Sequence, residues 1–301
     1  MLQNPDKDVM ECVAEALAQR KDPFDGLGTR ALQEQYIHNN FDVVEFKEIH
    51  LGTVLVRRKK GANKILTEKA QTFIYIPIIK SLEQLFSNKR IAELIFAKKE
   101  FSEGFYYDIT DGEWFKEDQY FKDHPDALMV IIFHDELEIC NPLGSRASVH
   151  KVDMFYYIFA NLTPKFRSKH SAVRLIAIAN AKHVKSYGIE KILSPVIEDL
   201  KRLYEGVKIV VAKKIITVYG KVVAATGDNE GQHQWGGFKE GFGVAFQKCR
   251  HCLCEFEQMQ RDFSEEQFVL RTKQNCDQQC HEIETAPNRN VRVNLETTYG
   301  T

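Results

Sequence analysis

The sequence predicts an α/β fold, in which helices cover a mixed sheet. Two observations support this class. Beyond residue 125, apolar runs of strand length alternate with one long segment of helical periodicity. The chain of 301 residues is also 44% hydrophobic, which is enough to bury a sizeable core in one large domain or two smaller ones.

Residues 1–124 are expected to form an accessory region that is mainly helical. Residues 1–40 have a helical pattern, with a break at KDPFDGLGTR, where proline and glycine favour a turn. The stretch HLGTVLVRRKKGANKILTEK predicts two strands around a basic turn, and IPIIKSLEQLFSNKRIAELIFAKK predicts a helical segment. The basic run at residues 57–60 is interpreted as a solvated turn.

Residues 125–244 are expected to form the α/β core. Apolar and aromatic residues dominate 127–139, 149–162 and 172–180, which predicts three strands. More strand is expected in VKIVVAKKIITVYGKVVAATGDN, after a helix that ends near Gly206. The apolar residues of that helix recur at three- and four-residue spacing: Ile189, Ile192, Leu193, Val196, Ile197, Leu200 and Leu203.

Two acids stand at strand ends in this core. Asp135 follows the apolar part of the first strand, and Asp228 follows the last strand. The ribonuclease H-like fold has this order: three strands, a helix and a fourth strand, with acids on the first and fourth strands. In that fold the two strands are neighbours, so the carboxylates are expected within about 6–8 Å of each other, where they can share Mg²⁺ or Mn²⁺.

Chance placement is the alternative for these acids, because the chain has 42 Asp and Glu residues. His134 precedes Asp135, but strand alternation directs it to the opposite face, where a packing or surface role is expected. The net charge of −1 means that DNA would have to be bound by a local basic face.

Residues 245–301 form a cysteine-rich segment, with five of the chain's seven cysteines between positions 249 and 280. The N-terminus lacks a secretory-signal pattern and no apolar run is long enough to span a bilayer, so an intracellular soluble protein is expected. In that setting clustered cysteines favour metal binding over disulfides. Structural Zn²⁺ is predicted on Cys249, Cys252, Cys276 and Cys280, with Cys254 and His281 in reserve; reduced cysteines in a surface loop are the alternative.

The motifs FHDELEICNPLGS, NLTPKFRSKHSAVRLIAIAN, TGDNEGQHQWGGFKEGF, CRHC and FVLRTKQNCDQQC follow one another along the chain. Together they resemble the transposase-like proteins of CACTA (En/Spm-type) DNA transposons. The resemblance runs from about residue 22 to the end and is strongest between Asp111 and Cys252. It implies a DDE/D transposase core for DNA cleavage and strand transfer, with Asp135 as the first acid and Asp228 as the second.

The same resemblance implies DNA partners (transposon ends), possible self-association, a nuclear location, and neither a membrane partner nor a small-molecule substrate. It also implies a copy truncated before the third acid, because none of the later glutamates matches that motif. The alternative function is an inactive transposon remnant that binds DNA or protein. The unmatched glutamates are Glu265, Glu266, Glu282, Glu284 and Glu296.

Overall fold

The computed structural model describes residues 24–60, 63–97, 104–139, 150–211, 214–239 and 243–301. The chain divides into two compact units, Met1–Val44 and Glu45–Thr301. In the first unit, α2 (Arg30–Asn40) begins after Thr29, whose side chain accepts a hydrogen bond from the Leu32 amide. This confirms the later part of the predicted N-terminal helical region; its earlier part lies outside the described residues.

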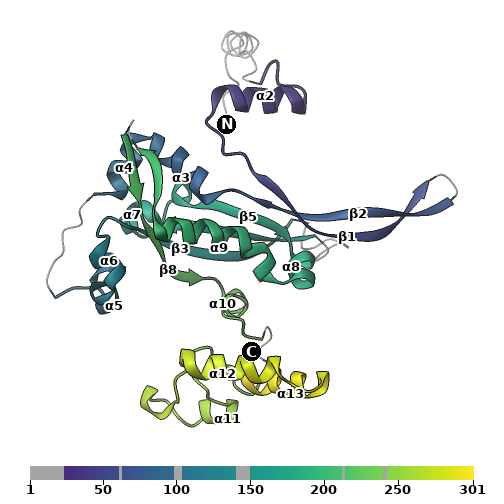
Figure 1. Ribbon diagram of the computed structural model, residues 1–301, viewed down its shortest axis with the longest axis vertical. Helices are drawn as coiled ribbons and strands as arrows, with labels where there is room; N and C mark the ends of the chain where they lie inside the picture. The colour runs from purple at the N-terminus through teal and green to yellow at the C-terminus, as the bar shows by residue number, and fades with distance from the viewer. Residues whose placement is uncertain (1–23, 61–62, 98–103, 140–149, 212–213, 240–242) are drawn as a thin grey trace, which may run out of the picture. The chain divides into compact units, whose positions relative to one another are not determined.

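A mixed six-stranded sheet organises the second unit (Figure 1). All neighbouring strands are antiparallel except the last pair, which is parallel. The α/β class is therefore confirmed, as are the three strands predicted between residues 127 and 180. From one edge to the other, the strands are β1 (Lys47–Lys60), β2 (Asn63–Tyr75), β5 (Arg174–Asn180), β4 (Lys151–Phe159), β3 (Leu128–Glu138) and β8 (Gly220–Thr226).

The predicted hairpin is present as β1 and β2, which pair along their whole length. Only the end of β2 joins the rest of the sheet, where Ile74 and Tyr75 pair with β5. These strands lie within residues 1–124, the expected accessory region, yet they extend the sheet of the core. The proposed boundaries at residues 124 and 244 remain predictions.

Helices cover both faces of the sheet. On one face, α3 (Ile78–Ser87) and α9 (Ile189–Glu205) pack in one apolar cluster with Leu128, Val130 and Ile132 of β3. On the other face, α6 (Gln119–Asp123) packs in a second cluster with Met129. Because successive strand side chains point to opposite faces, β3 contributes to both clusters.

The predicted long helix is α9, and it ends at Gly206 as expected. Gly206 has φ +100°, a conformation that other residues rarely adopt, and a Cβ there would lie 2.6 Å from the Tyr219 ring. The strand stretch that follows is divided, because β6 (Val207–Val211) and β7 (Lys214–Val218) form a separate two-stranded sheet. Only β8 enters the main sheet.

Among the helices of the described ranges, none is both long and apolar enough to cross a membrane.

The remaining elements are short. The helices not yet named are α4 (Lys89–Ile95), α5 (Glu113–Glu117), α7 (Pro164–Arg167), α8 (Ala181–Tyr187), α10 (Asn229–Trp235), α11 (Phe256–Met259), α12 (Lys273–Glu284) and α13 (Arg289–Tyr299), with 3₁₀ turns η1 (Ile109–Asp111), η2 (His170–Ala172) and η3 (Glu265–Gln267).

A buried hydrogen bond joins the hairpin to α9. The Tyr75 hydroxyl donates to Asp199 Oδ2 at 2.7 Å, and Arg202 lies 3.1 Å from the other carboxylate oxygen. Burial, and then the hydrogen bond with Asp199, raise the pKa of Tyr75 well above its ordinary value. The phenol therefore stays protonated and keeps donating across the neutral pH range.

We expect Tyr75→Phe to lower the free energy of unfolding by about 1–3 kcal/mol, because it leaves a buried carboxylate without one of its donors. Urea denaturation followed by circular dichroism measures this change. Tyr106→Phe is the control, since Tyr106 is 80% exposed and should behave like the wild type. Equal stability of both variants would contradict a role for this bond in holding α9 on the sheet.

Candidate functional site

The two acids singled out in the sequence lie at the same end of the sheet, although Asp135 is not the end of its strand, because β3 continues to Glu138. β3 and β8 are parallel neighbours, and their last paired residues are Phe133 and Thr226. Asp135 and Asp228 each stand two residues further along. The prediction that these two strands are adjacent in one mixed sheet is confirmed.

Both acids line one cavity of about 160 Å³ at this end of the sheet. Three further acids line it, so its donors are mostly carboxylate oxygens. Sequence reasoning did not select these three acids, Glu136, Asp153 and Glu230. Asp153 in particular reaches the cavity through the antiparallel register, which sets it opposite Glu136. The lining residues are His134, Asp135, Glu136, Asp153, Lys185, Asp228, Glu230, Gly231 and Gln234.

Asp228 is fixed by the helix that follows it. Its Oδ1 accepts a hydrogen bond of 2.7 Å from the Gly231 amide and so caps α10. In the described part of the chain, no hydrogen bond to the second oxygen, Oδ2, is seen. The cap therefore orients the carboxylate and leaves one oxygen for a ligand.

Asp135 follows His134 directly in β3 and pairs with Met154 of β4. Its side chain is exposed, and its charge acts on Tyr156 of β4. Burial and then the negative charge of Asp135 raise the pKa of Tyr156. Asp135 thus lies on the face opposite to His134, as strand alternation predicts, although both residues line the same cavity.

His134 is buried beneath the acids. Its ring stacks on Phe155 with 4.6 Å between centroids, and its Nε2 lies 3.3 Å from Asp153 Oδ1. That contact is not aligned as a hydrogen bond, and neither ring nitrogen has a hydrogen-bond partner among the described residues. His134 therefore has the expected packing role. Within the described residues, however, neither of its ring nitrogens has a hydrogen bond.

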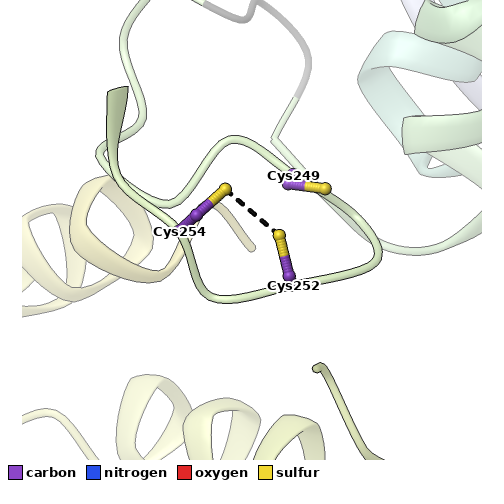
Figure 2. A group of neighbouring side chains, drawn as sticks. All are labelled: Cys249, Cys252 and Cys254. Atoms are coloured by element: carbon purple, nitrogen blue, oxygen red, sulfur yellow. Dashed lines mark hydrogen bonds between the residues drawn. The ribbon is translucent and has the colours of Figure 1, made fainter. Parts of the chain in front are cut away.

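A second cluster lies in the loop before α11. The sulfur atoms of Cys249, Cys252 and Cys254 all lie within 4.8 Å of one another and could hold a metal ion. Figure 2 shows the three side chains on this loop, with the hydrogen bond of 3.1 Å between the Cys252 and Cys254 sulfurs. None of the five described cysteines is in a disulfide.

This set differs from the predicted zinc ligands. Cys276 and Cys280 lie on α12 and do not belong to the group, whereas Cys254, expected only as a reserve, does. A β-bridge between Cys252 and Leu270 keeps the loop extended, so residues two apart point to the same side. The Cys-x-Cys spacing was the sequence signal for Cys254.

Arg271 fastens the cysteine loop to the rest of its segment. Its guanidinium donates to the backbone oxygens of Cys249 at 2.8 Å, Gln247 at 3.0 Å and Tyr299 at 2.7 Å. It also donates to the Gln279 side chain at 3.0 Å. These bonds fix the loop independently of any metal.

Two of the three thiols, Cys249 and Cys254, differ in acidity. Burial and the neighbouring thiols raise the pKa of Cys254 to about 12. Burial opposes ionisation of Cys249 as well, but hydrogen bonds from the His251 amide and the nearby thiols lower its pKa overall. Cys249 therefore forms a thiolate before Cys254 does as pH rises.

The glutamates considered for the third acid lie elsewhere. Glu265 and Glu266 are in η3, Glu282 and Glu284 are on α12, and Glu296 is on α13. None of them lines the cavity of Asp135 and Asp228. The Tyr299 hydroxyl hydrogen-bonds Glu282, and Arg292 pairs with Glu296 at 2.8 Å.

Neither a scan against protein-family models nor a search of curated proteins found a match to this chain. The function is therefore inferred from the residues and geometry of these two sites.

In metal-free protein we expect iodoacetamide to modify Cys249 faster than Cys254, because the thiolate is the nucleophile and Cys254 is both buried and a weak acid. Peptide mass spectrometry over a time course at pH 8 measures the two rates. Cys254 reacting as fast as Cys249 would mean that the loop opens in solution.

Proposed function

We propose that this chain is a transposase-like nuclease core with a ribonuclease H-like fold, which uses divalent metal ions to cleave DNA phosphodiesters. The position of Asp135 and Asp228 at the same end of two adjacent parallel strands carries the proposal. The strand order supports it, because β3 lies between β4 and β8, and α9 connects β5 to the β8 side. A nuclear location is part of the proposal, because the resemblance to CACTA transposase-like proteins implies it.

The cavity suits a hard divalent cation. Carboxylate oxygens are the ligands that Mg²⁺ and Mn²⁺ take in proteins, and five acids line this small space. Asp135 and Asp228 would hold the ion, with Asp153, Glu136 or Glu230 as further oxygen donors. A bound ion would polarise a phosphodiester and lower the pKa of an attacking water.

DNA would need a local basic face, because the chain has a net charge of only −1. Residues 57–64, which include the paired ends of β1 and β2, have the sequence RRKKGANK, with five basic residues and no acid. A two-stranded ribbon with a basic end is a shape that fits a DNA groove. We therefore assign the proposed DNA contact to the hairpin of β1 and β2.

A second candidate is a non-catalytic module that binds DNA or protein. Two lysines beside the acids favour it, since Lys185 lines the cavity and Lys151 pairs with Glu136. Ammonium groups that neutralise the carboxylates would compete with a metal ion for the same oxygens. The two candidates therefore differ in whether the cavity binds metal and supports cleavage.

We expect the chain to nick supercoiled plasmid DNA slowly in Mn²⁺, and Asp135→Asn or Asp228→Asn to reduce the rate by more than about 100-fold, because each removes a charged metal ligand. Gel electrophoresis of the plasmid measures nicking. Glu198→Gln is the matched control, since Glu198 is exposed on α9. Nicking that survives in both Asp variants comes from a contaminant, and no nicking by the wild type supports the binding module.

The cysteine loop is proposed to hold a structural Zn²⁺. Three thiolates and one further ligand would complete the tetrahedral coordination that zinc prefers. The three sulfur atoms already lie within 4.8 Å of one another, so a metal ion could replace the thiol protons after side-chain adjustments. In the metal-bound form the positive charge of the ion would stabilise the Cys254 thiolate, although the pKa of this thiol is raised in the metal-free protein.

We expect Zn²⁺ to protect Cys249, Cys252 and Cys254 from iodoacetamide, while Cys280, which is exposed on α12, remains reactive. Inductively coupled plasma analysis of purified protein should find one zinc in the wild type and in Cys280→Ser, and little in Cys254→Ser. Loss of zinc in Cys280→Ser, with retention in Cys254→Ser, would instead support the ligand set predicted from sequence.

A further inference from the structure

We propose that His134 is a nitrogen ligand of the metal site, so that the cavity selects Mn²⁺ or a later first-row divalent ion over Mg²⁺. The inference deepens the proposed function, because it concerns the ligands of the same cavity. It requires metal binding there but not DNA cleavage. Four observations carry it: a buried ring with no hydrogen bond among the described residues, the Asp228 carboxylate beside the same space, the glycine at position 231 that leaves this space free, and the position of Asp153.

The first observation is the unpaired state of the ring. The His134 side chain is 6% exposed, and both of its nitrogens lack a hydrogen bond among the described residues. Burying a polar group without a partner costs roughly 1–3 kcal/mol, and buried polar atoms are nearly always paired. An ion that accepts the nitrogen lone pair would remove this cost.

The second and third observations concern the space beside the ring. A Cβ built on Gly231 would lie 3.4 Å from His134 Nδ1 and 3.2 Å from Asp228 Oδ1. The imidazole nitrogen and the carboxylate therefore flank one point, and glycine leaves it free of a side chain. Gly231 is buried in α10 and does not have a positive φ, so its backbone does not require glycine.

The fourth observation is Asp153 on the other side of the ring. Its Oδ1 lies 3.3 Å from His134 Nε2, and its side chain is 5% exposed. Metal-bound histidines usually present their second nitrogen to a carboxylate, which fixes the tautomer and orients the ring. A small rotation would align this contact, with Nε2–H directed at Asp153 and the Nδ1 lone pair directed at the ion.

The donor set decides the choice of ion. Mg²⁺ takes oxygen ligands and keeps its waters, whereas imidazole suits the first-row transition metals. A site with one imidazole and several carboxylates therefore favours Mn²⁺ and the ions after it. Glu230, in the first turn of α10, and Glu136 are further carboxylates of the cavity lining.

The test is pulsed electron paramagnetic resonance of Mn²⁺ bound to the full chain. We expect a directly bonded ¹⁴N coupling in the wild type, its loss in His134→Gln, and a fall of about 10–100-fold in Mn²⁺ affinity with that substitution. Mg²⁺ affinity, measured by competition, should change less. His170→Gln is the matched control, because His170 is exposed and lies after β4, away from the cavity.

Gly231→Ala is a second variant that keeps α10, since alanine favours helix, but adds a methyl group between Nδ1 and Oδ1. It should weaken Mn²⁺ binding and leave the thermal unfolding of the metal-free protein unchanged or raised. A ¹⁴N coupling that persists in His134→Gln overturns the inference. Mn²⁺ that binds to the wild type without any ¹⁴N coupling also overturns the inference. If that binding is lost in Asp135→Asn and Asp228→Asn, the proposed function still stands. No Mn²⁺ binding at all overturns both.

Discussion

The parallel pairing of β3 with β8 is the constraint on which the proposed site depends. All other neighbours in the six-stranded sheet are antiparallel. A parallel neighbour requires a crossover along the sheet, and α9 provides it. Because the two strands then run in one direction, Asp135 near the end of β3 and Asp228 just after β8 lie at the same end of the sheet, where both line one cavity. An antiparallel β8 would place the second acid at the far end of the sheet.

The residues of the cavity also have structural roles. Asp228 caps α10 with one oxygen, and His134 packs on Phe155 while neither of its nitrogens has a hydrogen bond within the described residues. Buried polar groups without partners are costly, and in native proteins they are concentrated where a ligand binds. The cavity thus combines precise positioning from the fold with polar groups that a cation would satisfy.

The cysteine loop offers a different chemistry from the cavity. Its donors are three sulfur atoms, which suit zinc, whereas the cavity offers oxygens and one imidazole, which suit harder ions. Arg271 and the bridge between Cys252 and Leu270 hold the loop through the backbone. The metal ions proposed for the two sites would therefore be distinguished by ligand type.

The sequence by itself determined the α/β class, the hairpin, the three central strands and the helix that ends at Gly206, because these depend on local periodicity and turn chemistry. It also identified Asp135, Asp228 and the cysteine-rich segment. Tertiary structure alone decided which acids share the cavity, since Asp153 enters it through cross-strand register and His134 through burial. It also separated β6 and β7 from the main sheet, and it grouped Cys254 with Cys249 and Cys252, because an extended loop aligns residues two apart, whereas Cys276 and Cys280 lie on α12.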